Sequence, residues 1–138
     1  MRVFLDAKVI ISVLNKEYPL FTYTARLLSL ANDNRFTLVT SPLCLAISFY
    51  FSEKKHGSAI AKNKLSLLTQ HIEIIDCGEK EALAAINNVK VVDFEDGLQY
   101  YSAVNAKCSC IVSADLNDFY YSEIEVLEPE IFLRKYLN

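Results

Sequence analysis

The chain has few glycines and few prolines, with three of each among its 138 residues. None of the glycines follows the first predicted strand, so the sequence lacks the glycine-rich loop that holds phosphates in nucleotide-binding folds. There is also no internal repeat, no low-complexity tract and no linker long enough to divide the chain. Length and composition therefore predict one folded domain over residues 1–138.

Positive charge is not in excess. Lysine and arginine number 14 against 17 aspartates and glutamates, which gives a formal net charge of -3 and a pI near 5.4. No global positive field attracts nucleic acid, so RNA binding would need a local basic patch or a bridging metal. One lysine-rich segment is a candidate patch, although such runs are usually solvated faces: Lys54, Lys55, Lys62 and Lys64.

Paired cysteines and long apolar runs are missing as well. Cys44, Cys77, Cys108 and Cys110 form no C-x-x-C pair and lie in or beside apolar runs, which favours buried reduced thiols over a zinc site or disulfides. The N-terminus has Arg2 and a short strand instead of a signal peptide, and no segment is long enough to span a membrane. We therefore expect a cytoplasmic protein with no membrane part.

Short apolar runs alternate with helical patterns along the chain. Strands are predicted at 3–5, 36–40, 72–75, 109–113 and 125–127, the third of them buried. Helices are predicted at 7–16, 19–34, 41–56, 58–70, 79–86 and 93–107, with a last one from Pro129. This alternation predicts the α/β class, with a parallel sheet covered by helices on both faces.

Acidic residues occur at three places that such a sheet would bring to one edge. The first acid follows the first strand, a second group opens the helix at 93–107, and a third follows the strand at 109–113. The carboxyl edge is where open α/β sheets place their sites, and several carboxylates there are the ligands that Mg²⁺ or Mn²⁺ needs. The residues are Asp6, Asp93, Asp96, Asp115 and Asp118.

Each acid also has a plainer interpretation. Asp6 and Asp93 could cap helices, and Asp96 could complement a helix dipole. The Asp115–Asp118 segment could be only a turn. Ser113, at a strand end, could hold a metal-bound water or orient a carboxylate, whereas Glu95 should point away from the cluster and be solvated.

These residues resemble the PIN domain, as found in VapC-type toxins of toxin–antitoxin systems. The resemblance rests on three motifs that span most of the chain: Leu5-Asp6-Ala7, Asp93-Phe-Glu-Asp96-Gly-Leu-Gln-Tyr-Tyr-Ser-Ala103 and Ile111-Val-Ser113-x-Asp115-x-x-Asp118-Phe119. It implies a three-layer α/β/α sandwich on a central, mostly parallel sheet of four to five strands. It also implies an endoribonuclease that cleaves RNA with Mg²⁺ or Mn²⁺, a homodimer and a cognate antitoxin. In this family, Asp6, Asp96 and one or both of Asp115 and Asp118 would take the metal-binding and catalytic positions.

Two departures from the family pattern stand out. Lys8 replaces the Asn or Asp usual two residues after the first aspartate, so its ammonium would compete with the cation or hold a phosphate. The glutamate usual on the helix after the second strand falls on Ile47, and Glu53 is nearly two helical turns away. The site would then hold three acids where the family has four.

Three functional hypotheses follow. The first is a metal-dependent ribonuclease toxin. The second keeps the fold but has a degraded, non-catalytic site that binds RNA or a protein. The third is a nucleotide-binding or receiver-like protein, for which Asp76 would be the aspartate after the third strand, although the glycine content disfavours it.

Overall fold

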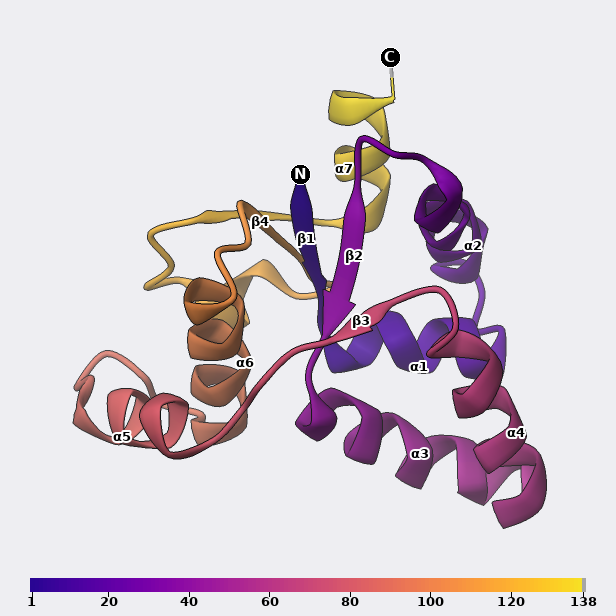
Figure 1. The fold of residues 1–138 in the computed structure, drawn as a ribbon, viewed down its shortest axis with the longest axis horizontal. Helices are drawn as coiled ribbons and strands as arrows, with labels where there is room; N and C mark the ends of the chain where they lie inside the picture. The colour runs from indigo at the N-terminus through magenta and orange to yellow at the C-terminus, as the bar shows by residue number, and fades with distance from the viewer. Residues whose placement is uncertain (138) are drawn as a thin grey trace.

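Five parallel strands form one sheet in the order β3-β2-β1-β4-β5 in the computed structural model, which describes residues 1–137 (Figure 1). The strands are short, and the central ones, β1, β2 and β4, are mostly buried, as expected of parallel strands covered on both faces. This arrangement confirms the predicted α/β fold and parallel sheet. The strands are β1 (Arg2–Leu5), β2 (Thr37–Thr40), β3 (Glu73–Ile74), β4 (Cys110–Val112) and β5 (Glu125–Leu127).

Helices cover the sheet on both sides (Figure 1). The first core cluster joins one sheet face to α1, α2 and α7, and the second joins the opposite face to α6 and the start of α3. Among the described residues, no helix is both long and apolar enough to cross a membrane. The helices are α1 (Ala7–Asn15), α2 (Phe21–Ser29), α3 (Pro42–His56), α4 (Ser58–Leu68), α5 (Glu79–Asn87), α6 (Phe94–Asn105) and α7 (Pro129–Tyr136), with 3-10 turns η1 (Leu30–Asn32) and η2 (Leu116–Phe119).

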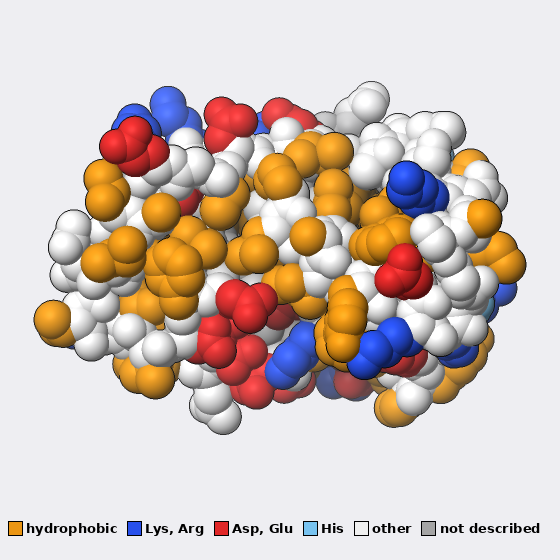
Figure 2. Space-filling model, turned by 90° about the horizontal axis from the view of Figure 1, so that it is seen from below, with side chains coloured by type: hydrophobic (Ala, Val, Ile, Leu, Met, Phe, Trp, Pro, Cys, Tyr) orange, Lys and Arg blue, Asp and Glu red, His pale blue; other side chains and the backbone are white. Residues whose placement is uncertain are grey.

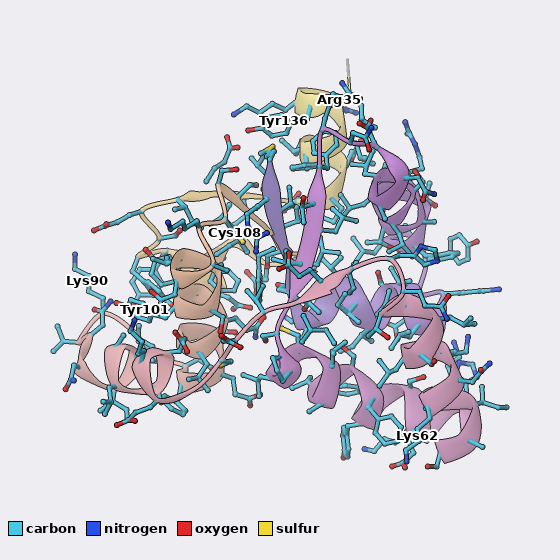
Figure 3. The ribbon with its side chains drawn as sticks, viewed as in Figure 1. Arg35, Lys62, Lys90, Tyr101, Cys108 and Tyr136 are labelled. Carbon is cyan, nitrogen blue, oxygen red and sulfur yellow. The ribbon has the colours of Figure 1, made fainter. Side chains whose placement is uncertain are left out.

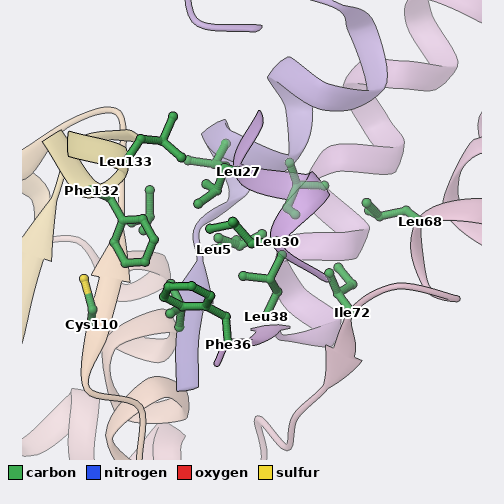
Figure 4. Packing of buried hydrophobic residues seen from close by; sticks show 14 of the residues in the cluster. Leu5, Leu27, Leu30, Phe36, Leu38, Leu68, Ile72, Cys110, Phe132 and Leu133 are labelled. Atoms are coloured by element: carbon green, nitrogen blue, oxygen red, sulfur yellow. The ribbon is translucent and has the colours of Figure 1, made fainter. Parts of the chain in front are cut away.

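The alternation of side chains along β1 connects the two core clusters. Val3 and Leu5 belong to the first cluster and Phe4 to the second, because successive side chains of a strand point to opposite faces. Figure 4 shows Leu5 packed among Leu27 and Phe132 of the flanking helices. Each such buried side chain contributes about 1.5–3 kcal/mol, so β1 is fixed from both sides.

Helix starts lie where the sequence predicts them in several places. Ser41 accepts a hydrogen bond from the Cys44 backbone N–H at 3.2 Å, and Pro42 is the first residue of α3. Pro129 likewise begins α7. The helix that follows β2 therefore starts directly at the carboxyl edge of the sheet.

Two sequence predictions need correction. The helix predicted at 19–34 begins only at Phe21, because residues 19–20 form a turn whose carbonyls accept from Thr22 and Tyr23, and it ends at Ser29 before the 3-10 turn η1. The third strand is shorter than predicted, and its residues are exposed because it lies at the sheet edge. The buried residues Ile72 and Ile75 flank it.

The four cysteines are free thiols. Cys44, Cys108 and Cys110 are buried, and Cys77 is half-buried. Burial raises the pKa of Cys44 and Cys110 to about 12, so these thiols behave as small apolar core groups.

Gly97 lets the loop before α6 pack closely against the helix. A Cβ at this position would lie 2.6 Å from Val91 Cγ1 and 3.1 Å from Ala85 Cβ. The first turn of α6, which carries Asp96, is thus held against the preceding loop and α5 by a contact that only glycine permits.

We predict that Gly97→Ala destabilises the protein by about 1–3 kcal/mol through overpacking. This loss exceeds the roughly 0.5–1 kcal/mol that alanine gains over glycine inside a helix. Urea unfolding followed by circular dichroism measures the change, and adding Val91→Ala should recover part of it. A Gly97→Ala variant as stable as the wild type would show that the loop yields without strain.

Candidate active site

The sheet order creates a crevice beside β1. From β1, the chain continues to β2 on one side, while β4 pairs with β1 on the other. The Asp6 backbone N–H donates to the Val112 carbonyl at 3.2 Å, so the residue after β1 lies against the end of β4. Such a switch point, at the carboxyl ends of the strands, is where open α/β sheets bind their ligands.

A cleft of about 220 Å³ opens at this point. Acidic side chains and one lysine make up its charged part, and apolar side chains from α1 and α3 form its other wall. Figure 2 shows acidic and basic side chains gathered side by side on the lower face of the molecule. The lining residues are Asp6, Ala7, Lys8, Ile11, Ile47, Phe51, Asp93, Glu95, Asp96, Gln99 and Asp118.

Asp6 has both a structural and an electrostatic role. Its Oδ1 accepts a hydrogen bond from the Val9 backbone N–H at 3.0 Å, so it caps α1. The residue is only 3% exposed, and burial raises the pKa of its carboxyl to about 6, although the neighbouring Ser113 and the Val9 N–H lower it. A carboxylate here is poorly solvated and would be stabilised by a nearby cation.

Asp96 is the most strongly perturbed acid of the cleft. Its pKa is raised to about 7, first by desolvation and then by the negative charges of Asp118, Asp93 and Asp6. Asp93 caps α6 by accepting from the Asp96 backbone N–H at 3.2 Å. The cap thus fixes the turn that brings Asp96 into the cleft.

The segment after β4 is held by a serine. The buried Ser113 Oγ accepts from the Asp115 N–H and donates to the Asp115 carbonyl, both at 3.0 Å. Asp115 in turn caps η2 by accepting from the Asn117 N–H at 3.0 Å. Asp118, one turn further, lines the cleft, whereas Asp115 does not.

Lys8 lies between the last two acids. Its Nζ is 3.8 Å from Asp115 Oδ2 and 3.7 Å from Asp118 Oδ2. Lys8 also lowers the pKa of Asp6 and of Asp96. The structure therefore places a positive charge inside the predicted acidic cluster.

Gln99 and Phe51 are site residues to which the sequence analysis assigned no role in the cleft. The buried Gln99 Oε1 accepts from the Ala7 N–H and from the Cys44 thiol, both at 3.3 Å, and so joins α6 to α1 and α3. The signal for Gln99 was its helical face, which it shares with Asp96. The sequence has no comparable signal for Phe51, because an apolar residue that lines a cleft has the same helical spacing as one that is buried in the core.

The structure also shows where the other residues singled out in the sequence lie relative to the cleft. Ile47 lines the cleft at the position where the family pattern expects glutamate, and the exposed Glu53 does not reach it. Glu95 is exposed, as predicted, but lies at the rim of the cleft. Asp76 lines a separate cavity of about 390 Å³ with Arg2, Glu73 and Lys80 among its neighbours.

The acids lie near one another but are not arranged as a closed metal site. Within residues 1–137, no three histidine, cysteine, aspartate or glutamate side chains are grouped so that they could hold a metal ion. What the cleft does provide is oxygen donors from three distant segments, by Asp6, Asp96 and Asp118. Oxygen donors are the type that Mg²⁺ and Mn²⁺ prefer.

Solved structures with the same fold cover nearly the whole chain. VapBC2 from Rickettsia felis, bound to a promoter DNA fragment, has a TM-score of 0.70 and 20% identity over 93% of this chain and 98% of that one. Mycobacterium tuberculosis VapC20, a toxin that cleaves the sarcin-ricin loop, has a TM-score of 0.71 and 12% identity over 90% and 98%. VapBC-1 from nontypeable Haemophilus influenzae has a TM-score of 0.73 and 17% identity over 94% and 99%.

Sequence comparisons identify the family more directly than these distant structural relatives. None of the curated proteins compared with the chain matches it. Residues 2–117, however, match the family model for the PIN domain. The chain therefore belongs to the PIN domain family.

Proposed function

We propose that this protein is the toxin of a toxin–antitoxin pair and acts as an endoribonuclease that requires Mg²⁺ or Mn²⁺. The observation that carries the proposal is the meeting of Asp6, Asp96 and Asp118 in one cleft, although they come from the beginning, middle and end of the chain. The family assignment and the fold shared with VapC structures support it.

The charge of the cleft suits a divalent cation. Asp118, Asp93 and Asp6 all raise the pKa of Asp96, so the carboxylates repel one another. Asp6 and Asp96 are the best placed ligands, because both are desolvated and both line the cleft. When bound, the cation would act as a Lewis acid on the scissile phosphate and lower the pKa of a bound water.

The protein's own residues would contribute ligands and orientation. Asp6 and Asp96 would hold the cation through carboxylate oxygens, and a bound cation would favour the charged form of Asp96. Ser113 fixes the backbone that leads to Asp118. Ile47 and Phe51 form an apolar wall that limits access of water to one side of the cleft.

RNA is the proposed substrate. VapC20, which shares the fold, is described as a toxin that cleaves the sarcin-ricin loop. Within residues 1–137, Lys54, Lys62 and Lys64 have no carboxylate within ion-pairing distance, so their charges are available to phosphates. Lys55 instead donates to the Asn15 carbonyl at 2.6 Å.

A second copy of the chain is the proposed occupant of an exposed apolar surface on α5, the α5–α6 loop and the first residue of α6. Val89 is 95% exposed and Val92 is 86% exposed, the largest values among the exposed large hydrophobic residues described. Contiguous patches of this kind mark interaction sites. The surface consists of Leu83, Ile86, Val89, Val92 and Phe94.

The proposed antitoxin has a different surface available. A groove of about 180 Å³ between α1, α2 and α4 is lined mainly by apolar side chains, including Val13, Leu28 and Leu67. Apolar grooves of this kind accept amphipathic segments of a partner. The fold is shared with VapBC2 and VapBC-1, and the resemblance to VapC-type toxins implies an antitoxin partner.

Two residues favour a second candidate function, a PIN-fold module that binds RNA or protein without cleaving. Ile47 supplies no carboxylate where the family pattern expects one, and Lys8 places a positive charge among the remaining acids. Both changes would weaken cation binding. RNA binding without cleavage at any Mn²⁺ concentration would support this function over the first.

The nuclease activity is tested by cleavage of a labelled RNA ladder in Mn²⁺. We expect cleavage by the wild type, its loss in EDTA, and a decrease of more than about 10-fold in Asp96→Asn, because an amide replaces a charged ligand of the cation and loss of even an outer-shell partner costs about 10–100-fold. Asp76→Asn, which removes an acid outside the cleft, is the matched control. Equal cleavage by Asp96→Asn and the wild type would reject the proposed site.

Stability should depend on pH through Asp96. Its folded pKa of about 7 lies above the ordinary 3.8, so between about pH 4 and 7 the folded state keeps a proton that the unfolded state loses. Stability in EDTA should therefore fall as pH rises through this window, with Asp6 contributing up to about pH 6. Asp96→Asn should show a smaller fall in the free energy of unfolding, and Asp76→Asn should match the wild type. Identical pH profiles for Asp96→Asn and the wild type would contradict the shift.

The apolar surface should control the oligomeric state. We expect the wild type to be a dimer and Val89→Asp/Val92→Asp to be a monomer, because charges would be buried at the interface. Both side chains are exposed in the single chain, so folding should be preserved. Light scattering after size exclusion measures the mass, with Ile60→Asp on α4 as control. A monomeric wild type would exclude the proposed homodimer.

A further inference from the structure

Lys8 occupies a position where a positive charge is unfavourable unless it is compensated. It is the second residue of α1, and the N-terminus of a helix carries partial positive charge. Within α1 itself, no acid occurs in the first turn, and the N-cap Asp6 is the one acid that the start of the helix supplies. The ion-pair partners of Lys8 are two acids from the segment after β4, Asp115 and Asp118.

The geometry of this contact is that of a shared counter-ion. Lys8 Nζ is nearly equidistant from the two carboxylates, at 3.8 Å and 3.7 Å. These are ion-pair distances rather than hydrogen bonds, so the ammonium is attracted to both acids without being fixed to either. Within residues 1–137, no other lysine, arginine or histidine lies within 4.0 Å of the acids of the cleft.

The cluster is thereby divided into two parts. Asp115 and Asp118 have a positive partner in Lys8, whereas Asp6 and Asp96 have no ion-pair partner among the described residues. A second divalent cation would have to approach Asp115 and Asp118, the two carboxylates that Lys8 already faces.

We propose that Lys8 is a tethered counter-cation that takes the place of a second metal ion, so that the cleft binds a single divalent cation at Asp6 and Asp96. The single bound cation in this inference rests on the proposed function, whereas the ion pair between Lys8 and the two aspartates does not. In it, Lys8 is a positioning residue that sets metal stoichiometry and keeps Asp115 and Asp118 close together in the metal-free protein.

Calorimetric titration with Mn²⁺ tests the stoichiometry. We expect one equivalent for the wild type and for Lys8→Arg, which keeps the charge. Lys8→Met should bind a second equivalent of Mn²⁺, or bind Mn²⁺ at least about tenfold more tightly. A charge within a few ångströms of a carboxylate shifts its proton affinity by about one to three powers of ten, and we expect an effect of similar size on its affinity for a cation. Lys62→Met is the matched control, because Lys62 lies on α4 away from the cleft (Figure 3). Two equivalents in the wild type, or Mn²⁺ binding within twofold in Lys8→Met, would overturn the proposal.

Thermal unfolding in EDTA provides a readout that needs no metal. Lys8→Met should lower the Tm more than Lys62→Met does, and the decrease should be smaller in an Asp118→Asn background, because the pair is then already broken. The same decrease in both backgrounds would overturn the ion-pair role.

The two experiments separate this inference from the proposed function. If neither the wild type nor Lys8→Met binds Mn²⁺, the metal-dependent function and the proposed stoichiometry are both rejected. A Tm decrease that is smaller in the Asp118→Asn background would in that case still support the ion-pair role of Lys8. Weaker RNA binding by Lys8→Met in EDTA with unchanged Mn²⁺ binding would instead assign Lys8 to phosphate recognition and overturn the proposal.

Discussion

The pairing of β1 with β4 is the constraint on which the site depends. Leu5 lies opposite Val112 in parallel register, and the next residue, Asp6, donates its N–H to the Val112 carbonyl. Both strands are buried on both faces, so neither can slip by one residue without turning its apolar side chains to the wrong side. The acids that follow each strand are consequently held at one edge despite their mutual repulsion.

The fold offsets this repulsion by giving the acids structural roles. Asp6, Asp93 and Asp115 each accept a backbone N–H at the start of a helix or helical turn. A carboxylate at such a position is stabilised by the hydrogen bond and by the helix dipole. Capping and a role in the cleft are therefore compatible for the same residue.

Much of this arrangement can be predicted from the sequence. The apolar runs and helix-start residues such as Ser41 and Pro129 predict the parallel sheet and its order of elements, and the acids that follow strands predict the position of the cleft. Asp93 was recognisable as a cap because Asp96 follows it three positions later. Local patterns were sufficient here, since each depends on neighbours in sequence.

The remaining features depend on side-chain reach across the fold. Residue spacing does not show that Lys8 contacts Asp115 and Asp118, or that Asp115 lies outside the cleft. The exposure of β3 follows from its edge position, which a run of β-branched residues does not reveal. Gln99 and Phe51 belong to the cleft only because α3 and α6 meet there.

The order of the elements also has a consequence for synthesis of the chain. Asp6 belongs to the first residues that emerge from the ribosome, whereas its neighbour β4 begins only at Cys110. Because domains acquire their long-range contacts only when both partners have emerged, a partly translated chain contains no assembled cleft. The proposed active site would therefore form only after the segment that follows β4 has emerged from the ribosome.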